Sequence, residues 1–288
     1  MSDLGSLLKK VSGDQASGSS EIYSELLKGL TEALASKPST KEWAEFSVGL
    51  SRVKRSMAPL QNVAGSIRFL LNAQIPEEQF NSFVKGFLND LAEREARAPE
   101  AIALKLIKEQ RPRRVLTLSY SGTVMAALSA MPTDVDVVVA ESLPLGEGAV
   151  TYRRLTEKGL KVSLIRDSMI AREMQHADLA LVGADGVCPE GVVNKVGTSL
   201  LALACKEANK PLVVVCSTSK LIPVLEMDPV DSSRTQDGLR YREALFELTP
   251  LEMVHSVITE EGVLSGMEMR QRLLRDRSKM KETECQEC

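Results

Sequence analysis

The sequence predicts an α/β fold in which a helical N-terminal domain precedes a Rossmann-like domain with a mainly parallel sheet. Up to about residue 110, apolar residues recur three and four positions apart, and no segment has the alternation of a strand. From Arg114 onward, short apolar runs alternate with helical stretches. This alternation is typical of parallel strands joined by helices that cover both faces of the sheet.

The N-terminal helices are recognised by their apolar spacing and by their start signals. Residues 21–30 carry apolar side chains three or four positions apart, as on one face of a helix. Ser39 and Glu42 form the pattern of a capping box, in which each side chain binds the other's backbone N–H. Pro76 and Pro99 are each expected to open a further helix, because proline is favoured in the first helical turn.

The second part of the chain is expected to alternate strands and helices. The predicted strands are Val115–Ser119, Val135–Glu141, Val162–Asp167, Leu179–Asp185 and Leu212–Cys216. The predicted helices between them include Thr123–Ala130, Gly148–Lys158 and Thr198–Asn209. In such sheets ligands bind beyond the carboxyl ends of the strands, so polar residues at these ends are expected to converge.

These patterns divide the chain into two expected domains. The helical domain is expected over residues 1–110 and the Rossmann-like domain over residues 111–288. Residues 1–20 are polar and rich in glycine and serine, and residues 275–288 are highly charged. Both ends are therefore expected to be flexible.

The composition is that of a globular protein and argues against direct contact with nucleic acids or membranes. Of the 288 residues, 43% are apolar, 26% charged and 4% aromatic, and the net charge is -3. This balance provides neither a basic surface nor stacking platforms for nucleic acid. The N-terminus lacks an apolar signal core, and no segment approaches the ~20 apolar residues of a membrane span. We therefore expect a cytoplasmic protein.

The sequence gives no indication of a metal or another cofactor. Cys188, Cys205 and Cys216 lie far apart, and the last two cysteines form a lone Cys-x-x-Cys on the charged tail. A zinc site would need a second cysteine pair or suitably spaced histidines.

The most informative segment contains Asp185, Asn194, Lys195, Gly197 and Thr198. An apolar run ends at the aspartate, and the last two residues open an apolar helical stretch. A helix start offers free N–H groups and a favourable dipole to an anion. The segment therefore predicts a site for a small phosphorylated ligand, with the phosphate beside the Asn-Lys pair. A plain connection with a capping threonine and a solvated lysine explains the same spacing.

Further candidate residues lie at other strand ends and in the helical part. Ser119 and Glu141 end the first two predicted strands. The remaining candidate ligand-binding residues are Arg55, Tyr120, Ser121, Gly122 and Thr123. The glycine and threonine could present helix N–H groups to a phosphate, although a helix cap by Ser121 explains them equally well. For Arg55, a solvated helix-end cation is the alternative.

Several motifs together resemble one superfamily. They are Gly183-Ala-Asp, Asn194-Lys-Val-Gly-Thr, Leu116-Thr-Leu-Ser-Tyr-Ser-Gly, Glu141-Ser-Leu-Pro, Leu164-Ile-Arg-Asp, Phe246-Glu-Leu-Thr-Pro and Ile258-Thr-Glu-Glu-Gly-Val-Leu. The superfamily contains the alpha, beta and delta subunits of translation initiation factor 2B, methylthioribose-1-phosphate isomerase and ribose-1,5-bisphosphate isomerase. The resemblance covers roughly residues 50–270 and implies a sugar-phosphate site and at least a homodimer.

The resemblance to the isomerases is only partial at the residues that carry catalysis. Asp185 falls on their catalytic aspartate, and Asn194 and Lys195 fall on their substrate-contacting pair. Ser119 stands where these enzymes have a cysteine, and Leu143 stands where they have an arginine.

Two further positions bear on the same comparison. Glu147 replaces a glutamine that is usual nearby in the family. Cys188 could supply a thiol in place of the missing cysteine, although a loop residue without chemistry is the other interpretation.

The alpha subunit of the initiation factor supplies the stronger functional analogy. Thr117, Tyr120 and Ser121 reproduce one of its turns, and Glu141 and Ser142 reproduce another, but that subunit carries glutamate in place of the Gly-Ala-Asp aspartate. We expect a phosphosugar- or nucleotide-binding regulatory subunit that senses a phosphorylated sugar or nucleoside monophosphate and assembles with translation-factor partners. The alternatives are an aldose-ketose isomerase with a non-standard proton donor and a purely structural interaction protein.

Overall fold

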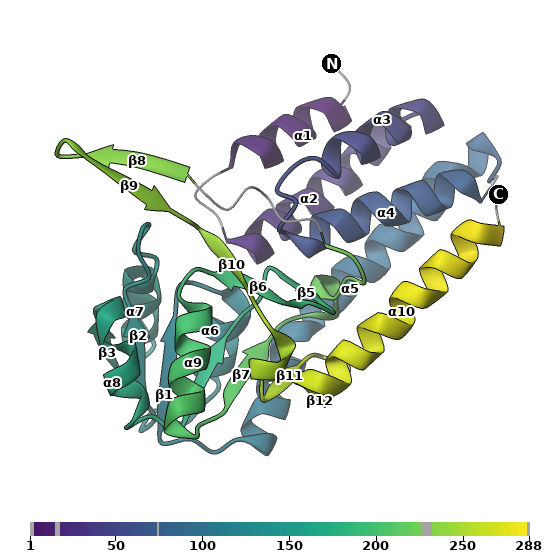
Figure 1. Ribbon diagram of the computed structural model, residues 1–288. Helices are drawn as coiled ribbons and strands as arrows, with labels where there is room; N and C mark the ends of the chain where they lie inside the picture. The colour runs from purple at the N-terminus through teal and green to yellow at the C-terminus, as the bar shows by residue number, and fades with distance from the viewer. Residues whose placement is uncertain (1–2, 15–17, 74, 226–231, 287–288) are drawn as a thin grey trace.

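The computed structural model describes residues 3–14, 18–73, 75–225 and 232–286. It confirms the predicted fold class, because a mostly helical N-terminal region precedes a seven-stranded, mainly parallel sheet (Figure 1). In Figure 1 the first four helices lie above the sheet, the fifth runs down alongside it, and a two-stranded hairpin projects away from the body.

The N-terminal helices pack their apolar faces into one core. They are α1 Asp3–Gly13, α2 Ser19–Ala33, α3 Thr40–Leu50, α4 Ala58–Asn72 and α5 Glu77–Glu109, with a 3-10 turn at Leu34–Ser36. Trp43 and Phe80 lie fully buried inside this core. The predicted capping box is present: the Glu42 N–H donates to Ser39 Oγ at 3.3 Å, and the Ser39 N–H donates to Glu42 Oε2 at 2.9 Å.

Helix α1 lies within the N-terminal segment for which the composition predicts flexibility. Three apolar side chains of α1 are buried: Leu4, Leu7 and Val11. They recur at helical spacing, which the glycine and serine content around them obscured. A Cβ atom built on Gly29 of α2 would lie 2.4 Å from Leu7 Cδ1, and one built on Gly49 of α3 would lie 2.4 Å from Leu8 Cδ2. The two glycines therefore allow α1 to approach both helices closely.

The expected helix start at Pro99 is wrong, because Pro99 lies inside the continuous helix α5. Proline removes one backbone donor and disfavours a helix interior. Here the residues after it, Ile102 and Leu106, are fully buried against the sheet. Burial of this helix face outweighs the local preference. Helix α10 (Gly266–Gln286) extends into the charged segment near the C-terminus.

The large sheet has the order β12-β11-β7-β4-β1-β2-β3, and only β12 runs antiparallel to its neighbour. Its strands are β1 Arg114–Leu118, β2 Asp136–Ala140, β3 Lys161–Ile165, β4 Leu179–Val182, β7 Leu212–Val215, β11 Ser256–Ile258 and β12 Val263–Ser265. The helices in this part are α6 Gly122–Ser129, α7 Gly148–Glu157, α8 Ile170–Met174, α9 Thr198–Ala208 and α10, with 3-10 turns at Asp167–Met169, Thr218–Lys220 and Leu251–Met253. The chain order reverses between β1 and β4, which is the topological switch point.

Alternating strand residues face two apolar cores, as expected for a sheet covered on both sides. Leu116 packs with residues of α8, α9 and α10, whereas Val115 packs with residues of α5, α6 and α7. The same alternation separates Ala180 from Leu181 on β4. This two-sided burial explains why these strands read as continuous apolar runs.

The sequence patterns did not reveal β11 and β12 of the large sheet, nor five short antiparallel strands outside it. Strands β5 Gly186–Cys188, β6 Gly191–Lys195 and β10 Phe246–Thr249 form a small sheet in the order β10-β6-β5, and β8 Ser232–Gln236 pairs with β9 Leu239–Glu243. Asn194 and Lys195 therefore lie on a strand rather than in a loop. The β8–β9 turn uses Asp237 and Gly238 at φ of 52° and 76°, which suits a tight hairpin.

Within the part of the chain that the structure describes, no helix combines the length and the apolar character needed to span a bilayer.

Candidate ligand-binding site

A cavity of about 430 Å³ lies at the carboxyl ends of β1 and β4, between the sheet and the N-terminal helices. The predicted site residues that line it are Ser119, Tyr120, Ser121, Gly122, Asp185, Asn194 and Lys195. The predicted residues that do not line it are Arg55, Thr123, Glu141, Gly197 and Thr198. The strand-end rule therefore located the cavity, but not every residue around it.

Asp185 and Lys220 are two of the buried charged groups that line this cavity. Asp185 follows β4, and its backbone N–H donates to the Val193 carbonyl at 2.8 Å while its carbonyl accepts from the Ala58 N–H at 2.9 Å. Lys220 closes the 3-10 turn after β7, is 2% exposed, and donates from Nζ to Ser19 Oγ. One residue of the pair thus connects to the start of α2.

For each of the two groups, burial and the charge of the partner shift the pKa in opposite directions. Burial raises the pKa of the Asp185 carboxyl, and the Lys220 ammonium is the largest influence that lowers this pKa again. Burial lowers the pKa of Lys220, and the Asp185 carboxylate opposes that change. An acid and a base with such environments are suited to proton transfer or to the charge-selective binding of a ligand.

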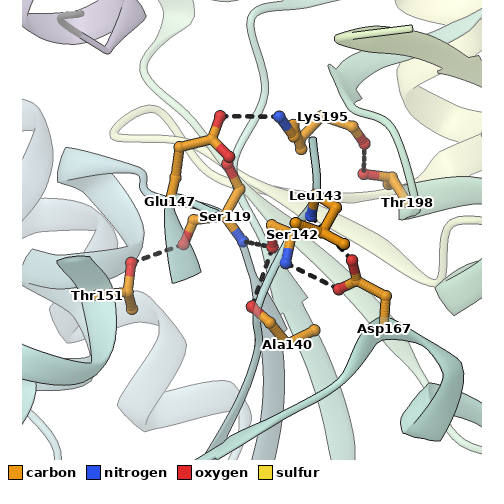
Figure 2. A network of polar contacts seen from close by, with 9 residues as sticks. All are labelled: Ser119, Ala140, Ser142, Leu143, Glu147, Thr151, Asp167, Lys195 and Thr198. Atoms are coloured by element: carbon orange, nitrogen blue, oxygen red, sulfur yellow. Dashed lines mark hydrogen bonds and ion pairs between the residues drawn. The ribbon is translucent and has the colours of Figure 1, made fainter. Parts of the chain in front are cut away.

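Lys195 lies at the same cavity and already has an anionic partner. Its Nζ lies 2.9 Å from Glu147 Oε1, and its side chain is 4% exposed (Figure 2). Glu147 begins the connection into α7 and points across the cavity toward the lysine. Its second oxygen, Oε2, is buried and has no hydrogen-bond partner among the described residues.

The end of β1 adopts a backbone conformation that is rare for residues other than glycine. Ser119 has a φ of 61° and Ser142, at the end of β2, has a φ of 63°. The Ser119 N–H donates to Ser142 Oγ at 2.6 Å, and Thr151 Oγ1 donates to the Ser119 carbonyl at 2.6 Å (Figure 2). Such backbone strain persists only where surrounding contacts enforce it, often at functional sites.

Asp167 fixes the β2–α7 connection. Its two carboxylate oxygens accept from the Ser142 and Leu143 N–H groups, both at 2.8 Å (Figure 2). Glu141, a candidate ligand-binding residue, forms an ion pair with Arg166. Leu143, where the isomerases have arginine, is 54% exposed and does not line the cavity.

The predicted anion site at the start of α9 is occupied by a carboxylate of the chain itself. Glu247 Oε1 accepts from the Gly197 N–H at 2.7 Å and from the Ser199 N–H at 2.8 Å. Thr198 Oγ1 donates to the Lys195 carbonyl at 2.6 Å and accepts from Asn194 Nδ2 at 3.0 Å. Gly197 and Thr198 therefore hold the Asn-Lys strand in place.

The starts of two other helices border the cavity. Residues 18–21 open α2, and Ser121 and Gly122 open α6. A Cβ atom built on Gly122 would lie 3.9 Å from Ser20 Cβ, so the two helix starts are adjacent. Tyr120 lies at this end, where its hydroxyl donates to Glu21 Oε1 at 3.2 Å.

The loop before α4 contributes Lys54 rather than the predicted Arg55. Lys54 and Met57 line the cavity, whereas the Arg55 side chain is exposed. Ser19 also lines the cavity, although the composition of its segment predicts a flexible end. Lys220 lines it too and follows the predicted strand Leu212–Cys216, so the strand-end rule applies to it as well.

The described residues contain no group of three or more His, Cys, Asp or Glu side chains that could hold a metal ion. Cys188 is buried and does not line the cavity, and burial raises the pKa of its thiol.

Fold and cavity define an α/β protein that joins a helical N-terminal part to a Rossmann-like sheet with a polar cavity at its switch point. Residues 15–266 match the sequence model of the initiation factor 2 subunit family. The chain belongs to this family, as the resemblance predicted.

Relatives of this chain include both initiation-factor-like proteins and isomerases. A translation initiation factor eIF-2B subunit 2-like protein of Pyrococcus furiosus is 30% identical over 227 residues, which cover 76% of this chain and 80% of that protein. The ribose 1,5-bisphosphate isomerase of Archaeoglobus fulgidus is 34% identical over 143 residues, which cover 45% of this chain and 46% of the enzyme.

Solved structures agree with the fold. The translation initiation factor eIF-2B structure from Pyrococcus horikoshii has a TM-score of 0.79 at 27% identity, covering 91% of this chain and 96% of that chain. The 5-methylthioribose 1-phosphate isomerase from the same organism has a TM-score of 0.69 at 17% identity, covering 96% and 88%. At that identity, the second likeness concerns the fold alone.

Proposed function

We propose that this chain is a sensing or regulatory subunit of the translation initiation factor 2B alpha type, which binds a phosphorylated sugar or a nucleoside monophosphate in the Asp185 cavity. The observation that carries the proposal is the buried Lys220 beside two helix starts. The Asp185 carboxylate already opposes the Lys220 charge, and a ligand phosphate can add a further charge-assisted hydrogen bond to this ammonium beside the helix starts.

We place the phosphate beside Lys220 and the starts of α2 and α6, not beside Asn194 and Lys195. The first N–H groups of a helix have no partner inside the helix and favour an anion. The start of α9 is filled by Glu247, and Lys195 is paired with Glu147. At the Lys220 end, the Glu21 carboxylate accepts from the Gly18 N–H of α2 at 3.1 Å, so the groups offered to a phosphate are the Lys220 ammonium and the first N–H groups of α6.

The site favours binding over turnover. Ser119 occupies the position of the isomerases' cysteine, and a hydroxyl is a poorer proton donor than a thiol because its intrinsic pKa is higher. Leu143 supplies no cation to the cavity. A pocket that retains its phosphate contacts but lacks these groups can still report the presence of a ligand.

A regulatory subunit must also assemble. The exposed face of α9 presents Leu200 and Leu203, which are 48% and 56% exposed, and Leu248 of the adjacent strand β10 is 38% exposed. One structural neighbour is a tetrameric eIF2B complex of two beta and two delta subunits. We propose that this apolar face contributes to a homodimer or to contacts with translation-factor partners, in the cytoplasm.

Ligand binding is expected to raise the melting temperature. A ligand present at 100 times its dissociation constant stabilises the folded state by about 2.7 kcal/mol. A thermal-shift comparison of ribose 5-phosphate and adenosine 5'-monophosphate with ribose and adenosine measures this effect. The phosphorylated compounds should shift the transition and the unphosphorylated ones should not. The absence of any difference between the members of each pair would refute a phosphate site.

An aldose-ketose isomerase is the second candidate, favoured by the buried Asp185 with its raised pKa beside Lys220. A carboxyl whose pKa moves toward neutrality is a better general base or acid. NMR of ribose 1,5-bisphosphate and methylthioribose 1-phosphate incubated with the protein would detect a ketose product. If turnover occurs, Asp185→Asn should abolish it and retain ligand binding. The regulatory proposal predicts no turnover in either protein.

A further inference from the structure

We infer that Glu147 makes the cavity selective for a ligand with a single phosphate, whose opposite end carries a hydroxyl or amine that donates to the Glu147 carboxylate. This inference rests on the proposed function, because it assumes that one phosphate binds at the Lys220 end. It assigns chemistry to both ends of the ligand and identifies the residue that rejects a second phosphate.

The first supporting observation is that Glu147 neutralises Lys195, the cation at the end of the cavity opposite Lys220. Its Oε1 lies 2.9 Å from Lys195 Nζ, and the lysine is 4% exposed. Ion pairs shielded from solvent are screened only weakly by salt, so this pairing persists at ordinary ionic strength. A ligand phosphate at this end would have to compete with a carboxylate already in place.

The second observation is the unused oxygen of the same carboxylate. Glu147 Oε2 is buried and has no hydrogen-bond partner among the described residues, although Glu147 lines the cavity. An ionised carboxylate only accepts hydrogen bonds, so the group that completes this site must be a donor. Sugar hydroxyls and nucleobase or sugar amines are donors, whereas a phosphate dianion is not.

The third observation is the charge distribution across the cavity. Asp185, 9% exposed, adds a further acidic group between the Lys220 end and the Lys195 end. Lys220 is the cation that influences Asp185 most, and Glu21 is a further acidic group at the start of α2. Glu147 is the carboxylate paired with Lys195, so a second phosphate at the Lys195 end would meet its charge. Like charges brought together cost several kcal/mol in a buried contact, which is how a site rejects a close analogue.

The test uses two pairs of probes that differ by one phosphate. They are ribose 5-phosphate with ribose 1,5-bisphosphate, and adenosine 5'-monophosphate with adenosine 3',5'-bisphosphate. Titration calorimetry gives the ratio of the two dissociation constants within each pair. We expect the wild-type protein to prefer the monophosphate of the better-binding pair by at least about tenfold. A preference for the bisphosphate would overturn the inference.

Glu147→Gln is nearly isosteric and removes only the charge. It should release Lys195 and reduce the preference for the monophosphate by about tenfold or more. Adding Lys195→Met to this variant should remove the gained affinity for the bisphosphate. Glu173→Gln is the matched control, because Glu173 also forms a 2.8 Å ion pair, with Arg114, outside the cavity. The control should keep the wild-type ratio.

The outcomes separate the inference from the proposed function. If wild type binds a monophosphate and Glu147→Gln keeps the wild-type ratio, the inference is wrong and the proposed function stands. If no probe binds wild type, the proposed function fails and the inference fails with it. Glu147→Ala provides a second charge-free variant in case Glu147→Gln does not fold, and circular dichroism establishes that each variant is folded.

Discussion

Replacing Lys220 with methionine is expected to lower the free energy of unfolding by about 3 kcal/mol at neutral pH. Methionine keeps the length and apolar contacts of the buried stem but removes the charge opposite Asp185. Leaving a buried charge without its partner typically costs about 3–5 kcal/mol. The lower end applies here, because Lys195 also lowers the pKa of the Asp185 carboxyl and remains in place.

The effect of Lys220→Met should depend on pH. Loss of the ammonium removes the largest influence that opposes burial, so the folded-state pKa of Asp185 rises further. A carboxyl with a raised folded-state pKa favours folding when protonated. The loss of stability should therefore be small below the unfolded pKa of about 3.9 and grow as the pH rises through the folded-state value. Urea denaturation of both proteins between pH 4 and pH 8 measures this difference.

A second substitution separates charge from packing in this variant. Asp185→Asn in the Lys220→Met background removes the uncompensated carboxylate and should recover most of the lost stability at neutral pH. If the double variant is as unstable as the single one, the two charges are not coupled. Phosphate binding should not recover, because a charged hydrogen bond contributes about 1.5–3 kcal/mol, or about tenfold to 150-fold in affinity.

Local sequence patterns were sufficient to predict the architecture and the position of the cavity. Continuous apolar runs predicted the parallel strands, and the strand-end rule brought Ser119 and Asp185 together. These inferences succeed because a sheet buried on both faces constrains every residue of its strands. The segment that follows Asp185 added the Asn-Lys pair, which the structure also places at the cavity.

At other positions the local sequence patterns gave a wrong or incomplete prediction, because contacts between distant segments decide the structure there. The start of α9 was predicted to bind an external anion, but Glu247, on a strand that pairs with β6, occupies it. Nothing near Gly197 in the sequence reveals this partner. Glu147 was noticed only as a departure from a glutamine, since its ion pair with Lys195 joins two distant segments. Polar pairings of this kind depend on the fold as a whole.

The N-terminal segment shows how composition can mislead when it is read without periodicity. Ser19 contacts Lys220, and the start of α2 lines the cavity, although these residues follow a stretch rich in glycine and serine. The apolar spacing of α1 is brief, and its helix is only eleven residues long. Isolated helices of that length are marginal in water, so α1 owes its stability to packing on α2 and α3.

Leu4→Ala is therefore expected to destabilise the protein by about 2–5 kcal/mol, the usual range for truncating a buried leucine. Leu4 is 1% exposed and belongs to the core that contains Trp43. Urea denaturation measures the loss, and Ser6→Ala, at an exposed position of the same helix, is the matched control. Exposed substitutions usually stay within about 0.5 kcal/mol of wild type. If Leu4→Ala is as stable as Ser6→Ala, residues 3–13 do not dock in solution, and the flexible end expected from the composition is correct.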